Sequence, residues 1–174
     1  MVMGGFSARR YPFDCHPGFG VSALRTVMLV GPSRWAVQQQ MTKRFAEGLN
    51  YSIDVDGSKA ICRVWSRPDL DSKTGAQLAT EKIALFRQLA GGDTLGLLFD
   101  LSQAPAVTGP KTQQALSEMM QAWQAAGKPV AVVAGGNSIQ QLQLRRLIST
   151  FAPDQGALFG SAEEATAWLD SRLP

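Results

Sequence analysis

One stretch of the chain, residues 94–124, constrains the fold more than any other. Its sequence, TLGLLFDLSQAPAVTGPKTQQALSEMMQAWQ, joins a short apolar run to an amphipathic run through a loop. The run Leu95–Phe99 is too short for a buried helix and lies between Asp93 and Asp100, which favours a strand covered on both faces. In the second run, the apolar residues recur at the spacing that places them on one face of a helix: Leu116, Met119, Met120 and Trp123. We therefore predict a central strand, a loop and a helix.

Before this stretch, the pattern predicts a hairpin and a helix. Apolar and polar residues alternate over residues 51–55 and again over residues 60–64, and the turn-forming pair Asp56-Gly57 lies between them. A helix is predicted from about Ser72, because apolar residues then recur at helical spacing until the glycine pair at 91–92.

After this stretch, two further strand–helix pairs follow. Residues 129–134 predict a second buried strand and residues 157–159 a short last one, while Ser138 and Ser161 begin capping boxes of two helices. Helices that connect strands at these spacings require right-handed crossovers. The sequence therefore predicts an α/β fold with a mixed sheet, mostly parallel with an N-terminal antiparallel hairpin, and about four helices.

The N-terminal residues differ in character from the rest. Residues 1–44 carry six basic residues and one acidic residue and show no lasting period, so we predict a poorly ordered basic tail, followed by a domain over residues 45–174. Two alternatives are a translation start at Met41 and a basic arm that binds a partner or a targeting factor. The folded part shows no basic stripe, which does not favour nucleic acid as a partner.

The sequence also indicates where in the cell the protein is expected. The apolar run Val27–Val30 is too short for the core of a signal peptide or for a membrane span, so we expect a cytoplasmic protein without a membrane partner. Cys15 and Cys62 form neither a disulfide framework nor a metal-binding spacing.

Residues for common enzyme chemistry are missing from the predicted domain. His16 is the only histidine and lies in the tail, so the domain cannot contain a Ser-His-Asp or Cys-His arrangement. The aspartates are scattered over turns and strand ends, and we predict that Asp100 accepts hydrogen bonds from nearby loop N–H groups. We predict no catalytic site, no metal site and no cofactor.

Two loops leave the carboxyl ends of predicted strands, where ligands and partners of α/β sheets bind. The first is Ser102 to Gly109. The second contains Gly135, Gly136, Asn137 and Ser138, in which the glycines let the backbone approach an anion at a helix N-terminus. Two interpretations of the second loop remain open: a site for a nucleotide or another small ligand, or a corner that is simply tight.

The element order resembles the STAS domain over about residues 50–172. Three segments carry the resemblance: FDLS at Phe99–Ser102, Thr108-Gly109 before a helix, and LFGSAEEATAWL at Leu158–Leu169. It is greatest for bacterial anti-sigma factor antagonists. The resemblance implies a non-enzymatic regulatory domain that binds another protein, either an anti-sigma factor, a kinase-like protein or a second STAS chain. The implied partner-binding residues are Ser102, Gln103, Val107, Thr108, Gly109 and Lys111.

The resemblance also implies a phosphorylation switch. In the antagonists, a serine in an Asp-Ser-Ser-Gly-like motif at a helix N-terminus is phosphorylated, and the dianionic phosphate alters the docking surface. The matching position here is Val107 or, with a shift of one residue, Thr108; Ser102 is a second candidate. The alternative for Thr108 is that it only caps the helix that follows.

Overall fold

The sheet holds six strands, arranged in the order in which they occur in the sequence. The structure, a computed structural model, describes residues 42–106 and 109–174. The strands are β1 (Lys43–Gly48), β2 (Tyr51–Asp56), β3 (Lys59–Trp65), β4 (Gly96–Gln103), β5 (Val130–Ala134) and β6 (Gly156–Phe159). The pairs β1–β2 and β2–β3 are antiparallel, and β3 to β6 run parallel to one another. The predicted α/β fold with a mixed, mostly parallel sheet is confirmed.

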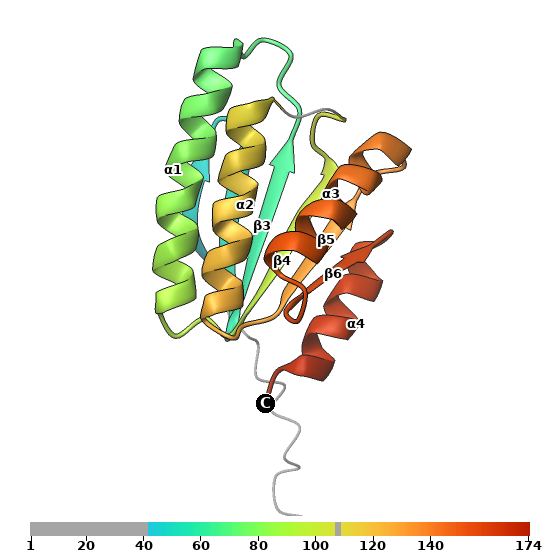
Figure 1. The fold of residues 1–174 in the computed structure, drawn as a ribbon. Coiled ribbons are helices and arrows are strands. Elements are labelled where there is room, and N and C mark those ends of the chain that lie inside the picture. The colour runs from blue at the N-terminus through green and yellow to red at the C-terminus, as the bar shows by residue number, and fades with distance from the viewer. Residues whose placement is uncertain (1–41, 107–108) are drawn as a thin grey trace, which may run out of the picture. The chain divides into compact units, whose positions relative to one another are not determined.

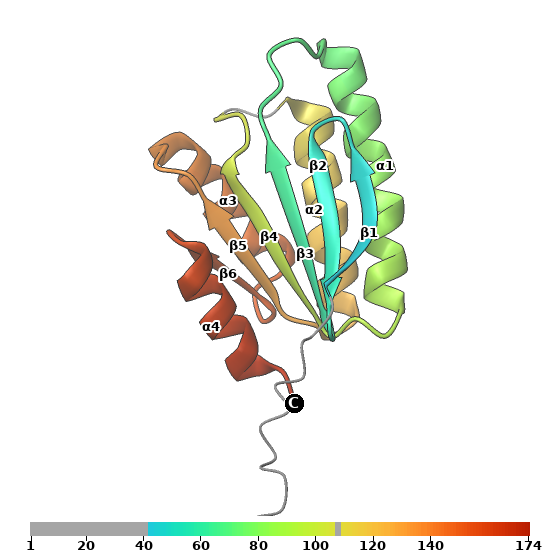
Figure 2. The ribbon, with the colours of Figure 1, turned by 180° about the vertical axis from the view of Figure 1, so that it is seen from behind.

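Four helices cover the sheet, three of them on one face. They are α1 (Ser72–Gly91), α2 (Pro110–Ala125), α3 (Ser138–Phe151) and α4 (Ala162–Arg172). Figures 1 and 2 show α1, α2 and α3 side by side on one face and α4 on the other. Because successive parallel strands are added in one direction, right-handed crossovers place their three helices on the same face.

Strand β1 is absent from the sequence prediction, which begins the sheet with a two-stranded hairpin. β1 pairs with β2 from Gly48 opposite Tyr51 down to Lys43 opposite Val55, with a bulge between Arg44 and Ala46. Lys43 and Arg44 therefore belong to the sheet, although the sequence analysis assigns them to the tail. The other expectations for the tail, including Met41, Cys15 and His16, concern residues outside the described part.

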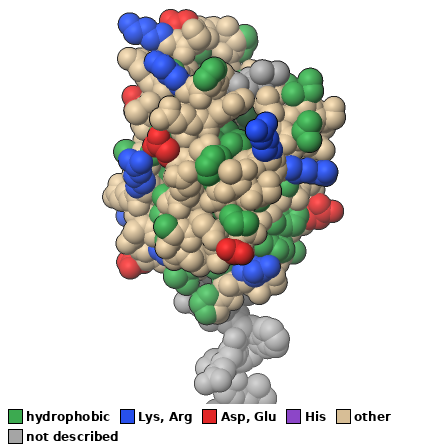
Figure 3. All heavy atoms as spheres, in the orientation of Figure 1, with side chains coloured by type: hydrophobic (Ala, Val, Ile, Leu, Met, Phe, Trp, Pro, Cys, Tyr) green, Lys and Arg blue, Asp and Glu red, His purple; other side chains and the backbone are tan. Residues whose placement is uncertain are grey.

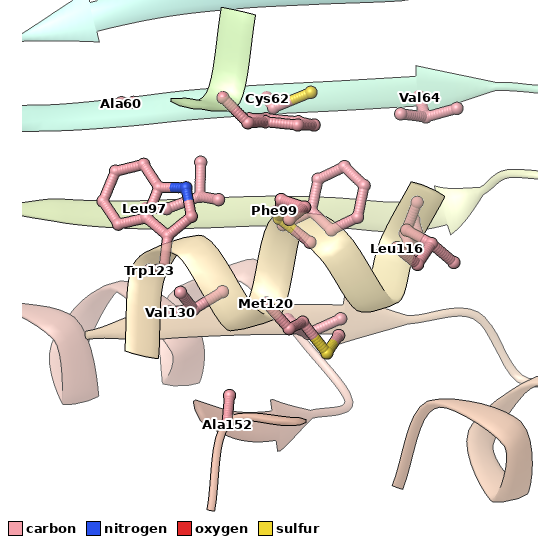
Figure 4. Packing of buried hydrophobic residues seen from close by; sticks show 14 of the residues in the cluster. Ala60, Cys62, Val64, Leu97, Phe99, Leu116, Met120, Trp123, Val130 and Ala152 are labelled. Carbon is pink, nitrogen blue, oxygen red and sulfur yellow. The ribbon is translucent and has the colours of Figure 1, made fainter. Parts of the chain in front are cut away.

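The main core lies between the sheet and the first three helices. Figure 4 shows Trp123, Met120 and Leu116 of α2 among side chains of β3, β4 and β5. The predicted inward stripe of α2 is confirmed, because Leu116, Met119, Met120 and Trp123 are all buried. Full burial of a side chain of this size stabilises a fold by about 1.5–3 kcal/mol, so this face of α2 fixes the helix on the sheet.

Among the described elements, only α4 packs on the opposite face of the sheet. Helix α4 buries Ala165 and Leu169 against Leu98, Ala131 and Val133 of β4 and β5. As predicted, Ser161 caps α4 by accepting a hydrogen bond from the Glu164 N–H at 3.2 Å.

Beside α4, no described helix covers this face of β1, β2 and β3 (Figure 2). Asp54 is only 7% exposed there and pairs with Arg44 at 2.6 Å and with Arg63 at 3.0 Å. These two ion pairs join the three antiparallel strands across their uncovered face.

In the described part, no helix is both long and apolar enough to cross a membrane.

Candidate functional site

The carboxyl ends of β3, β4 and β5 meet at one edge of the sheet. The N-terminal ends of α2 and α3 lie at this edge, and the turn between β1 and β2 reaches it because β1 runs parallel to β3. Backbone bonds fix the arrangement: Trp65 N–H donates to the Asn50 carbonyl at 3.1 Å, and Ser66 N–H donates to the Gln103 carbonyl at 2.8 Å. Both loops singled out by the sequence therefore belong to a single surface, as expected for an α/β sheet.

The first loop, here called the β4–α2 corner, comprises residues 102–111. Ser102, Gln103 and Lys111 are exposed, and within the described part their side chains make no hydrogen bond or ion pair. Asp100 accepts a hydrogen bond from the Ser102 N–H at 2.9 Å, which confirms the role predicted for it.

The expected cap of α2 differs from the observed one. Gly109, with φ −70° and ψ 167°, occupies the N-cap position, and Pro110 is the first helical residue. The cap therefore falls one residue after Thr108, because proline with its fixed φ suits the first position of a helix. Glycine has no side chain with which to cap. Val107 and Thr108 lie outside the described residues.

The second loop, the β5–α3 corner, comprises residues 135–138. Asn137, and not Ser138, is the N-cap of α3: its side-chain oxygen accepts hydrogen bonds from the N–H groups of Ile139 at 2.9 Å and Gln140 at 3.1 Å. Asparagine and serine are both good N-caps, and the helix starts one residue before the position predicted from the capping box.

Gln140 ties the two corners together. Its side chain is buried, accepts a hydrogen bond from the Gly135 N–H at 3.0 Å and donates one to the Leu101 carbonyl at 3.2 Å. Gln141 also donates to the Gly135 carbonyl at 3.1 Å. The N–H groups of Gly135, Ile139 and Gln140 are thus already bonded to side chains of the domain and are not available to an anion.

The two corners also touch directly. A Cβ atom added at Gly135 would lie 2.8 Å from the backbone oxygen of Ser102. Gly136, by contrast, has no atom within 4 Å of such a Cβ position. The first glycine is therefore required by the close approach of the two loops, and the second is not.

A cavity of about 180 Å³ lies below this edge. It extends between α1, α2 and α3, above β3 and β4, and most of its wall is apolar. Pro105 and Gly109 of the β4–α2 corner also line it, so the cavity adjoins that corner. This cavity was not predicted from the sequence.

Lys82 of α1 brings a positive charge to the cavity wall. Its Nζ atom lies 3.5 Å from Oδ1 of Asn50 and 5.0 Å from the centre of the Tyr51 ring. Burial lowers the pKa of Lys82 below its usual value, although Cys62 and Glu81 partly oppose this shift. A signal for Lys82 exists in the sequence: Leu78 and Phe86, four residues away on either side, are both buried, so Lys82 interrupts an inward face.

Two other ionisable groups in the described part, Cys62 and Asp69, have shifted pKa values. Burial raises the pKa of the Cys62 thiol from 9.0 to about 12, so the thiolate needed for nucleophilic chemistry is scarce at neutral pH. Arg67 lowers the pKa of Asp69 to about 2 through a hydrogen bond and an ion pair. No group of three His, Cys, Asp or Glu residues within residues 42–106 and 109–174 could hold a metal ion.

Charged side chains of both signs are scattered over the helical face and do not gather into one patch (Figure 3). Such a face lacks the continuous basic surface that nucleic-acid binding requires.

Comparison with known proteins adds no relative: no protein-family model matches the chain, and no curated protein matches it. Function is therefore inferred from the geometry of this edge and from the resemblance of the sequence to the STAS domain.

Proposed function

We propose that this chain is a non-enzymatic, cytoplasmic interaction domain of the STAS type, which regulates another bacterial protein by binding it. The observation that carries the proposal is the contrast between used and unused polar groups at one edge. Ser102, Gln103 and Lys111 hold polar side chains in solvent without a partner in the described part. Such groups are free to bond to a docking protein, whereas bonded ones must first break their own contacts.

The proposed docking surface is the β4–α2 corner, with Ser102, Gln103, Gly109 and Lys111 as its described residues. Val107 and Thr108 belong to the same loop, and phosphorylation of Thr108 would add a dianionic group at the N-terminal end of α2. The proposed partner is an anti-sigma factor, a kinase-like protein or a second STAS chain. The small-ligand alternative at Gly135, Gly136, Asn137 and Ser138 is less favoured, because the Gly135 N–H is already bonded to Gln140 and the Asn137 side chain already caps α3.

Capture of the partner from the native cell tests the docking surface. We expect wild-type protein to retain a regulatory protein and Lys111→Glu to lose it, because reversal of a charge at an interface repels a complementary partner. Lys43→Glu is the matched control, since Lys43 is also exposed but lies at the opposite edge of the sheet. Equal loss with both variants, or retention with both, would contradict this location.

Intact-mass measurement tests the switch. Protein purified from its own cells should contain a fraction heavier by one phosphate, and Thr108→Ala should remove that fraction. If no such fraction occurs under any growth condition, the interaction domain is not switched at Thr108.

A further inference from the structure

The cavity between α1, α2 and α3 is partly open to solvent and much larger than one water molecule. Protein interiors contain few voids larger than one water molecule, whose share of liquid volume is about 30 Å³. The cavity here measures about 180 Å³. In volume it is comparable with an engineered apolar cavity of about 150 Å³, which holds one benzene molecule.

The wall of this cavity is suited to a hydrocarbon group. Its apolar part includes Val64, Phe86, Phe99, Leu101, Leu116 and Met119. Polar residues are few, with Asn50 and Lys82 together in one part of the lining. A mostly apolar pocket with a small number of placed polar groups is the usual form of a small-molecule site.

Lys82 is the unusual member of the wall. Its ammonium group has one long hydrogen bond, 3.5 Å to Asn50, and the face of the Tyr51 ring at 5.0 Å. In the described part, it forms no ion pair with a carboxylate, and its helical neighbour Glu81 is exposed. A half-buried cation without an anionic partner is costly unless another group supplies the charge.

We propose that this cavity binds a small monocarboxylate with an apolar body, such as a medium-chain fatty acid. The carboxylate would accept hydrogen bonds from the Lys82 ammonium beside Asn50, and the hydrocarbon would lie against Phe86 and Phe99. A phosphate fits less well, because a dianion needs more donors than one ammonium and one amide supply. The cavity shares Gly109 with the proposed docking surface, but binding at Lys82 does not depend on a partner at that surface.

Octanoate and 1-octanol serve as the probes, because they share the length of the alkyl chain and differ in charge. We titrate each into the full chain and follow binding by calorimetry and by the amide signals of residues around the cavity. Octanoate should bind wild-type protein at least tenfold more tightly than octanol, since a hydrogen bond to a charged group adds roughly that factor or more. Equal affinities, or no binding of octanoate, would overturn the proposal.

Lys82→Met tests the charge, because methionine keeps an unbranched side chain and removes the ammonium. The variant should fold, since it loses a half-buried charge together with one long hydrogen bond to Asn50 and the contact with the Tyr51 ring. It should bind octanol about as well as wild-type protein does and should lose the preference for octanoate. Lys73→Met is the matched control: Lys73 is exposed on the same helix and is not part of the cavity lining. A preference for octanoate that survives Lys82→Met, or disappears in Lys73→Met, would refute the role of Lys82.

Gly75→Leu tests the location. Gly75 of α1 lines the cavity, and a Cβ atom there meets nothing within 4 Å, so a side chain can begin at this position without a clash. Replacing glycine inside a helix also favours folding. The variant should therefore be stable and bind both probes more weakly. Unchanged affinity for both probes would place them elsewhere on the protein.

Discussion

The two corners at the carboxyl edge have similar sequences of turn-forming residues but different chemistry. In the β5–α3 corner, the side chain of Gln140 accepts from the Gly135 N–H, and that of Asn137 accepts from two N–H groups in the first turn of α3. In the β4–α2 corner, the cap is a glycine and the side chains of Ser102 and Lys111 are exposed and unpartnered in the described part. Glycines and polar residues at the end of a strand therefore do not by themselves make a binding site. A ligand or partner needs polar groups that are not already hydrogen-bonded within the domain.

The largest effect should come from Gln140→Leu. The substitution removes the partner of the half-buried Gly135 N–H and one of two bonds to the Leu101 carbonyl, which still accepts from the Ala104 N–H. An unsatisfied N–H costs about 1–3 kcal/mol and a lost hydrogen bond about 1 kcal/mol, so the free energy of unfolding in urea should fall by roughly 2–4 kcal/mol. Gln143→Leu is the control on the same helix, because no hydrogen bond of Gln143 occurs in the described part. Equal losses would mean that Gln140 does not close the β5–α3 corner.

Substitution of the two glycines should separate contact from turn geometry. Gly135→Ala should lower the free energy of unfolding by about 1–3 kcal/mol, because the new Cβ meets the Ser102 oxygen at 2.8 Å. Gly136→Ala should leave it unchanged or raise it by up to about 1 kcal/mol, since its φ is not positive and the space is open. Chemical denaturation of both variants measures this. If Gly136→Ala were the more harmful, the close contact would not be the reason for the glycine pair.

The cap of α3 provides a smaller effect. Asn137→Ala should cost about 1 kcal/mol in thermal unfolding, because two N–H groups lose their acceptor. Ser138→Ala should change stability by less than about 0.5 kcal/mol, although the sequence pattern names Ser138 as the cap. A larger loss of stability in Ser138→Ala than in Asn137→Ala would instead support Ser138 as the N-cap.

The smallest effect should follow Gly109→Ser at the other corner. Serine adds a side-chain acceptor at the N-cap of α2, but glycine is itself tolerated there, so stability should rise by only a few tenths of a kcal/mol. Thermal melts in triplicate resolve a change of this size. A gain as large as the loss in Asn137→Ala would show that water does not already satisfy the N–H groups of the β4–α2 corner.

Much of the fold was predictable because its signals are local. The stretch 94–124 contains β4 and α2 within a few residues of the predicted bounds, and the positive φ of 58° at Gly57 fits the predicted hairpin turn. Strand β1 was missed because Ala46 alone of its residues packs against the core, so β1 shows no alternation of apolar and polar residues. β1 is a strand because it pairs with β2, and the local sequence carries no signal of that pairing.

The candidate site was less predictable, since its decisive contacts join distant residues. Gln140 reaches Leu101 across 39 positions of sequence, and Lys82 reaches Asn50 across 32. A glutamine in a helix or a lysine between apolar residues is ordinary in a sequence. Only the packing of three helices over the sheet shows that the first closes a corner and the second lines a cavity.

The order of the sheet has a consequence for synthesis on the ribosome. Each strand pairs with the strand that precedes it in sequence, so every new strand finds its neighbour already made. Short-range pairing of this kind favours fast folding, and domains form as their N-terminal parts emerge. Helix α4, of 11 residues, follows all six strands in the sequence and is the only described helix that covers the apolar side of β4 and β5. Until it leaves the exit tunnel, the nascent domain exposes this surface, and chaperone contact should end when α4 docks.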